Sequence, residues 1–141
     1  MKIVIASDSY KGCLTSLEVA NAIQEGILEA IPECETTCVA VADGGEGTVE
    51  AIVENMRGKF IDVRVSGPLG NTVTARYGIV RNIAVMEMAQ ASGLALVPRE
   101  QLNPLKASTI GTGQMIKHAI DNGCREFLIG IGGSATNDGG I

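Results

Sequence analysis

The sequence has little that is typical of membrane or zinc proteins. No apolar run approaches the roughly eighteen residues that a membrane-spanning helix needs. The four cysteines include no C-x-x-C pair, and the chain has a single histidine, His118. We therefore expect no zinc site, and we predict reduced thiols that are mostly buried.

A positive charge balance is also missing. The formal net charge is −5, whereas nucleic acids and anionic membranes attract basic surfaces, so we expect neither as a partner. An anionic substrate would need local cations. The apolar stretch at residues 3–6 is too short for the core of a signal peptide, and we expect a cytoplasmic protein.

Familiar nucleotide-binding signatures are absent. The sequence contains neither the P-loop pattern G-x-x-x-x-G-K-[ST] nor the signature set of protein kinases. Residues 130–135 do satisfy G-x-G-x-x-A, a pattern of dinucleotide-binding folds. The acidic residue expected about twenty positions later would lie beyond residue 141, so the match is weak.

Strand and helix patterns alternate in the first half of the chain. Residues 2–6 form a β-branched run, and Thr15 with Glu18 makes a capping box that predicts a helix ending at Pro32. Residues 37–42 predict a second strand, and an apolar stripe over residues 49–56 predicts a second helix. This order is typical of a parallel sheet flanked by helices.

The second half begins with a change of period. Residues 60–80 alternate with period two around the turn at residues 66–71, which predicts an antiparallel hairpin. Later segments predict strands at residues 83–88 and 127–131 and a loop at residues 98–104. A helix capped by Thr112 is predicted at residues 112–121. The expected fold class is α/β, a mostly parallel sheet with flanking helices and an antiparallel hairpin insertion.

The last predicted strand runs into glycine-rich residues without a helix to cover it. A sheet left bare on one face is unusual in this class. We therefore expect residues 1–141 to be one incomplete α/β region of a longer protein.

Three polar loops follow predicted strand ends, at residues 7–12, 43–48 and 132–140. If the strands are parallel, the loops share the edge of the sheet where ligands bind in such folds. Glycine allows successive backbone N–H groups to converge on an anion, and a helix N-terminus adds a favourable partial charge. The loops therefore indicate a phosphate or small-anion site.

Charged residues in these loops are candidates for the chemistry. Lys11 is their sole cation and could neutralise a phosphate or the carboxylate of a small acid. Four carboxylates could hold Mg²⁺ or accept a proton from an attacking hydroxyl, and the sequence leaves these roles open: Asp8, Asp43, Glu46 and Asp138. Asp8, Asp43 and Asp138 also have a plain interpretation as turn residues, and Lys11 as a solvated loop lysine.

Three further features leave alternatives open. Glu87 lies among apolar residues, so it should form a structural salt bridge or contact a ligand. Residues 108–113 could cradle an anion or cap a helix. His118 falls on the polar flank of its helix, and we expect it to be exposed.

Six segments together resemble bacterial glycerate kinases of the glycerate 2-kinase type. They are residues 2–12, 41–49, 66–70, 87–94, 111–113 and 129–140. The departures are small: Ser7 stands where proline is expected, Tyr10 where phenylalanine is usual, and Cys13 where serine or a charged residue is usual.

The resemblance implies an ATP- and Mg²⁺-dependent enzyme with two α/β domains that phosphorylates D-glycerate, giving 2-phosphoglycerate. It also implies a longer chain, so that residues 1–141 alone would be inactive, and it leaves a homo-oligomer open. Transferred by position, the catalytic candidates are Asp8, Lys11, Asp43 and Asp138, of which Asp43 and Asp138 are also the metal candidates. The candidates for binding substrate or phosphate are Ser9, Gly44, Gly45, Glu46, Gly132, Gly133, Ser134, Thr136, Asn137 and Gly139.

Two other functions compete with this one. A non-catalytic α/β domain could hold a small anion on the same loops, and a nicotinamide-dependent oxidoreductase would use the pattern at residues 130–135.

Overall fold

A computed structural model describes residues 1–10, 13–41 and 43–139. The chain divides into two compact units, Met1–Asp43 and Gly44–Ile141.

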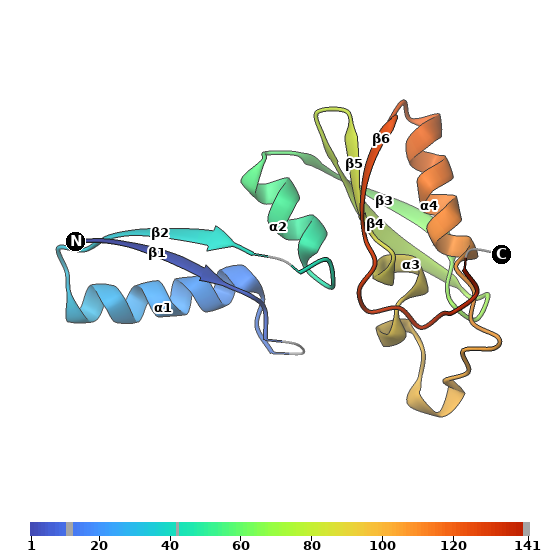
Figure 1. Cartoon of the computed structure of the whole chain (residues 1–141), viewed down its shortest axis with the longest axis horizontal. Helices are drawn as coiled ribbons and strands as arrows, with labels where there is room; N and C mark the ends of the chain where they lie inside the picture. The colour runs from blue at the N-terminus through green and yellow to red at the C-terminus, as the bar shows by residue number, and fades with distance from the viewer. Residues whose placement is uncertain (11–12, 42, 140–141) are drawn as a thin grey trace. The chain divides into compact units, whose positions relative to one another are not determined.

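The first unit is a single βαβ arrangement. It contains β1 (Lys2–Ser7), α1 (Ser16–Ala30) and β2 (Glu35–Ala40), and α1 lies along the two strands in Figure 1. The strands are parallel, in a register that runs from Lys2 opposite Glu35 to Ser7 opposite Ala40. Their carboxyl ends therefore lie side by side, as the sequence predicted, although β2 begins and ends two residues earlier than expected.

The capping box explains where α1 begins. The Glu18 N–H donates to the Thr15 hydroxyl at 3.3 Å, and the Thr15 N–H donates to a Glu18 carboxylate oxygen at 2.7 Å. Both donors would otherwise lack a partner at the helix start. The Ser16 hydroxyl donates to the Ser7 carbonyl and accepts from the Val41 N–H, so it ties the helix to both strand ends.

The second unit contains a four-stranded sheet in the order β3-β4-β5-β6. Its strands are β3 (Lys59–Ser66), β4 (Thr72–Val80), β5 (Ile83–Glu87) and β6 (Glu126–Gly130). The helices of this unit are α2 (Thr48–Asn55), α3 (Ala89–Ser92) and α4 (Ile110–Asp121), with short 3₁₀ turns η1 (Leu94–Leu96) and η2 (Arg99–Gln101).

The α/β class, the flanking helices and the antiparallel hairpin are confirmed. The pairs β3–β4 and β4–β5 are antiparallel, and β5–β6 is parallel. The hairpin thus supplies two of the four strands in this sheet. Fewer strand pairs are therefore parallel than the mostly parallel sheet that the sequence predicted. The hairpin strands, of eight and nine residues, are the longest in the chain as described, so they dominate the sheet.

Side chains that alternate along the strands make two separate apolar layers. On one face Val80 and Val85 pack against Val49 and Val53 of α2. On the other face α3 and α4 cover the larger cluster, which includes Tyr77, Met86 and Met115. Figure 1 shows α2 and α4 on opposite sides of the sheet.

Several local predictions were wrong. Helix α4 begins at Ile110 and not after Thr112, because Thr109 is its N-cap and the Thr112 hydroxyl instead bonds Ser92 Oγ at 2.7 Å. The four-residue α3 is too short to leave a periodic signal, and it was missed. Within the expected loop at residues 98–104, η2 forms one 3₁₀ turn.

The described cysteines are all free thiols, with Cys34 and Cys124 buried, Cys38 half-buried and Cys13 exposed. In the part of the chain that the structure describes, no helix has the length and apolar character needed to cross a membrane.

Candidate functional site

The edge of the first unit carries Asp8 and Ser9, directly after β1. The Ser9 N–H donates to Asp8 Oδ1 at 2.7 Å, and the Asp8 side chain is exposed. This contact matches the turn interpretation of Asp8. Lys11, the predicted cation of this loop, lies outside the described residues.

Two glycine loops meet in the second unit, at the end of β6. The Gly132 N–H donates to the Gly44 carbonyl at 3.0 Å. A Cβ added at Gly130 would lie 2.5 Å from the Gly44 oxygen, and one at Gly132 would lie 2.8 Å from Gly45 Cα. Glycine is required at both positions by this close approach. The two loops follow strands of different sheets, β2 and β6, so the expectation that they share one edge of a single sheet is wrong, although residues 44–45 and 130–132 are in contact.

The third loop is pinned to the segment that follows β5. The Leu94 N–H donates to the Gly133 carbonyl at 2.8 Å, and the Ala135 N–H donates to the Ser92 carbonyl at 2.9 Å. Ser92 is fully buried and was not among the predicted site residues. A buried serine that follows three small or polar residues carries no distinctive sequence signal, because its role depends on contacts distant in sequence.

Hydrogen bonds within the loop set its shape. The Thr136 N–H donates to Ser134 Oγ at 3.0 Å, which closes a small turn. Gly133 and Gly139 have φ values of 71° and 61°, which favour glycine. Asn137 is exposed. Of the predicted anion-binding groups here, the Ser134 hydroxyl serves the loop itself.

Asp138 is bound to the start of α4. The Thr109 N–H donates to Asp138 Oδ2 at 2.7 Å, and the Thr109 hydroxyl lies 3.2 Å from the same oxygen. The Thr109 side chain does not cap the helix; the Asp138 carboxylate satisfies the Thr109 N–H, and the Ser108 hydroxyl accepts from the Ile110 N–H at 3.2 Å. The structure thus places this predicted catalytic residue in a capping role through one of its two oxygens.

The start of α2 is held in an unusual way. Gly47, its N-cap residue, has φ of 91° and no side chain with which to cap the helix. Instead the Val49 N–H donates to Glu87 Oε1 at 2.7 Å, and the Gly44 N–H donates to the Thr48 hydroxyl at 3.1 Å. The glycine loop and the first turn of α2 therefore form one hydrogen-bonded unit.

Glu87 is completely buried. Burial raises the pKa of its carboxyl group, while the hydrogen bond from Val49 acts in the opposite direction. Among the described residues no salt bridge reaches Glu87, and its carboxyl group accepts a hydrogen bond from the Val49 backbone N–H instead.

Acidic residues in the described ranges do not gather into a ready metal cage. No group of three or more His, Cys, Asp or Glu side chains is arranged to hold an ion there. Asp43 and Glu46 are exposed, and Asp138 is half-buried. A magnesium ion bound with nucleotide needs only one or two protein carboxylates, because phosphate oxygens and water complete its shell. Asp43 and Asp138 are compatible with that donor chemistry.

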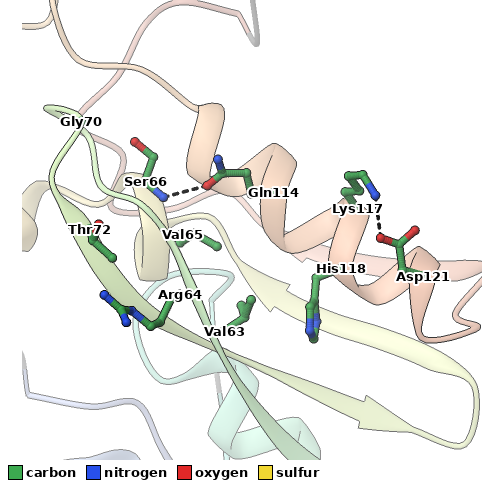
Figure 2. Close-up of a pocket in the computed structure, with 10 residues that line it drawn as sticks. All are labelled: Val63, Arg64, Val65, Ser66, Gly70, Thr72, Gln114, Lys117, His118 and Asp121. Carbon is green, nitrogen blue, oxygen red and sulfur yellow. Dashed lines mark hydrogen bonds and ion pairs between the residues drawn. The ribbon is translucent and has the colours of Figure 1, made fainter.

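A groove of about 460 Å³ lies between β3 and α4 (Figure 2). Lys117 pairs with Asp121 at 2.6 Å, and Gln114 Oε1 accepts from the Ser66 N–H at 2.7 Å. His118 is half-buried and not exposed as predicted, because its Nδ1 lies 3.0 Å from the hydroxyl of buried Tyr77. None of the predicted site residues lines this groove.

Comparison with known proteins agrees with the resemblance. The model of the glycerate kinase family matches residues 3–141. A glycerate kinase from Halalkalibacterium halodurans is 54% identical over 140 residues, and the glycerate 2-kinase of Escherichia coli is 51% identical over 142 residues. These alignments cover 98% and 99% of this chain and 37% of each relative.

A solved structure gives the same result for the fold. A protein proposed to be glycerate kinase 2 from Salmonella typhimurium LT2 matches with a TM-score of 0.84 and 54% identity, over 100% of this chain and 38% of that one. The chain therefore spans a little over a third of the length of these proteins. The chain belongs to the glycerate kinase family.

Proposed function

We propose that the full-length protein is an ATP-dependent kinase that phosphorylates D-glycerate and forms 2-phosphoglycerate. The observation that carries this proposal is the contact between Gly44 and Gly132, in a chain of the glycerate kinase family. It joins two loops rich in backbone N–H groups at the end of a strand and the start of a helix. Such an edge suits phosphate binding, since both features favour anions.

The proposed reaction is an in-line phosphoryl transfer. A hydroxyl oxygen of glycerate forms a bond to the γ-phosphorus of ATP, the bond from that phosphorus to the β–γ bridging oxygen breaks, and ADP leaves. The proton of the hydroxyl passes to a carboxylate. Asp43 and Asp138 are our candidates for this base, and Asp8 is a third.

The remaining roles are assigned by charge and position. Lys11 would neutralise either the transferred phosphoryl group or the carboxylate of glycerate. The glycine loops at residues 44–47 and 132–139 would hold phosphate oxygens through backbone N–H groups. Mg²⁺, bound by Asp43 or Asp138 together with ATP, would neutralise charge on the phosphates. We further propose that the protein acts in the cytoplasm.

A product assay on the full-length protein tests the proposal. We expect ADP to form only when ATP, Mg²⁺ and D-glycerate are all present, and we expect phosphorus NMR to assign the new ester to the 2-position. L-glycerate and lactate are the control substrates. Binding of ATP or glycerate without turnover would favour the anion-binding alternative. Oxidation of glycerate with reduction of a nicotinamide would favour the oxidoreductase.

A further inference from the structure

Glu87 stands where the two glycine loops are joined to the sheet. It is the last residue of β5 and lies opposite Gly130, the last residue of β6, in the parallel register. The Met88 N–H donates to the Gly130 carbonyl at 2.9 Å, which joins the ends of the two strands. The loop at residues 130–133 leaves the sheet here, and the Glu87 side chain holds the helix that follows residues 44–47.

Among the residues that the structure describes, no other side chain is seen to take over this task at the start of α2. Gly47 cannot cap the helix, and the Thr48 hydroxyl is used by the Gly44 N–H. The bond of 2.7 Å from the Val49 N–H to Glu87 Oε1 is therefore the side-chain cap of α2. Because Gly44 also bonds Gly132, a shift of α2 would move both loops.

The surroundings of Glu87 do not suit a negative charge. Its side chain is fully buried, and no residue in the described ranges gives its second oxygen, Oε2, a hydrogen bond. An ionised carboxylate without a cation is rarely kept in such a place, since it takes up a proton instead. Oε1 accepts a hydrogen bond, so the proton belongs on Oε2.

The charged groups around Glu87 support this assignment. From α2 the carboxylate of Glu50 approaches, and its charge opposes a second negative charge. On β4 the charged side chain of the same face is Arg76, which pairs with Asp62 of β3 at 2.7 Å. From α3 comes the neutral amide of Gln90, and from β6 comes Gly130. In the described ranges no cation pairs with Glu87.

We propose that Glu87 is a positioning residue whose neutral carboxyl group holds the first turn of α2, and with it the glycine loop at residues 44–47, against the end of β6. Its effect on turnover rests on the proposed kinase function. Its protonation state and its hold on α2 do not depend on that function.

Two substitutions in the full-length protein separate this role from a general loss of structure. Glu87→Gln keeps the length, the neutral charge and the acceptor oxygen. Glu87→Asp keeps the acid but shortens the reach by one methylene group, so the bond to Val49 is strained or lost. Glu54→Gln, on the exposed side of the same helix, is the matched control.

The first readouts need no catalysis. The infrared difference spectrum between the wild type and Glu87→Gln at pH 7 should contain the carbonyl band of an un-ionised carboxyl group, which disappears as the pH is raised. Amide hydrogen exchange at Val49 should be unchanged in Glu87→Gln and faster by about tenfold or more in Glu87→Asp. Absence of the band, or equal exchange in all variants, overturns the proposal.

Kinetics then tests the link to turnover. At pH 7 the kcat/KM of Glu87→Gln should stay within about threefold of the wild type, and that of Glu87→Asp should fall by about tenfold or more. On the alkaline side the wild type should lose activity that Glu87→Gln retains. A tenfold loss in Glu87→Gln would show that the charge is needed, and would overturn the proposal. A wild type that binds but never turns over refutes the kinase function, and the infrared and exchange results still decide the role of Glu87.

Discussion

Asp138 caps helix α4 through Thr109, which donates to the carboxylate from its backbone N–H at 2.7 Å. The accepting carboxylate comes from the loop after β6, and the donating N–H belongs to the N-terminus of a helix that precedes β6 in sequence. The contact therefore closes the third glycine loop onto α4. It gives a residue proposed for catalysis a structural role as well, and the two roles need separate tests.

Substitution of Asp138 separates these roles. Asp138→Asn keeps an acceptor oxygen, so it should lower the free energy of unfolding by about 0.5 kcal/mol at most. Asp138→Ala removes the acceptor and should lower it by about 1 kcal/mol. If Asp138 accepts the proton, both variants should lower kcat by about a hundredfold or more. Urea unfolding and steady-state kinetics measure the two effects. Asp121→Asn, at the other end of α4, is the control, and an unchanged kcat in Asp138→Asn would exclude the catalytic role.

Replacement of Lys11 tests the proposed cation. Lys11→Ala should reduce kcat/KM by about tenfold or more, which corresponds to about 1.4 kcal/mol of lost transition-state stabilisation. Lys106, an exposed lysine of the second unit, supplies the control Lys106→Ala. A loss for Lys11→Ala below about threefold, or under about 0.7 kcal/mol, would show that the assigned role is wrong.

The packing of the two glycine loops predicts a sharp difference between glycines. An added Cβ at Gly130 would lie 2.5 Å from the Gly44 carbonyl oxygen, so Gly130→Ala should lower the free energy of unfolding by about 1–3 kcal/mol and reduce turnover. An added Cβ at Gly113, within α4, has no heavy atom within 4 Å. Gly113→Ala should instead raise stability by about 0.5–1 kcal/mol. Equal stability of the two variants in thermal or urea unfolding would contradict the close contact.

The Tyr77–His118 hydrogen bond should contribute to stability. Tyr77→Phe removes the hydroxyl next to His118 Nδ1 and should lower the free energy of unfolding by about 1 kcal/mol. Tyr10→Phe, at a position 63% exposed, should change it little. Burial raises the pKa of Tyr77 above its ordinary value of 10. The contribution of Tyr77 to the free energy of unfolding is thus fully present below pH 10 and is lost as the pH rises through its raised folded-state pKa. Tyr77→Phe has no phenol to ionise, so it should lack this pH dependence.

Glu87 should also make the stability of the protein depend on pH. Since burial raises its pKa above the ordinary value of 4.5, its contribution is fully present below pH 4.5 and is lost as the pH rises through the folded-state value. Glu87→Gln cannot ionise, so its stability relative to the wild type should increase over that range. Urea unfolding at several pH values measures the difference, and a constant difference would mean that Glu87 does not titrate there.

Residues 1–141 by themselves should not catalyse the reaction. They correspond to 37–38% of the length of their relatives, and alignment of two reactants can account for about 7–11 kcal/mol of a barrier. Exposed apolar side chains such as Leu128 should also favour self-association. A coupled assay for ADP and light scattering test this, and glycerate-dependent turnover by residues 1–141 would contradict it.

Much of this fold could be predicted from local signals. The capping box of Thr15 and Glu18 places the start of α1, and the period of two over residues 60–80 identifies the hairpin β3–β4. The segments that resemble glycerate kinases were sufficient to assign the family, because such motifs depend on the order of residues and not on their contacts. These features lie within a few residues of one another, so the sequence determines them directly.

The partners of the polar side chains were decided only by the tertiary structure. Glu87 caps a helix 38 residues earlier in the chain, and Asp138 caps one 29 residues earlier. Gly132 was predicted to bind phosphate, and the structure shows that both Gly130 and Gly132 admit the backbone of residues 44–45. Hydrophobic period and capping motifs report on neighbours in sequence. Burial and hydrogen bonding between distant segments depend on how the sheet brings those segments together, and no local pattern records that.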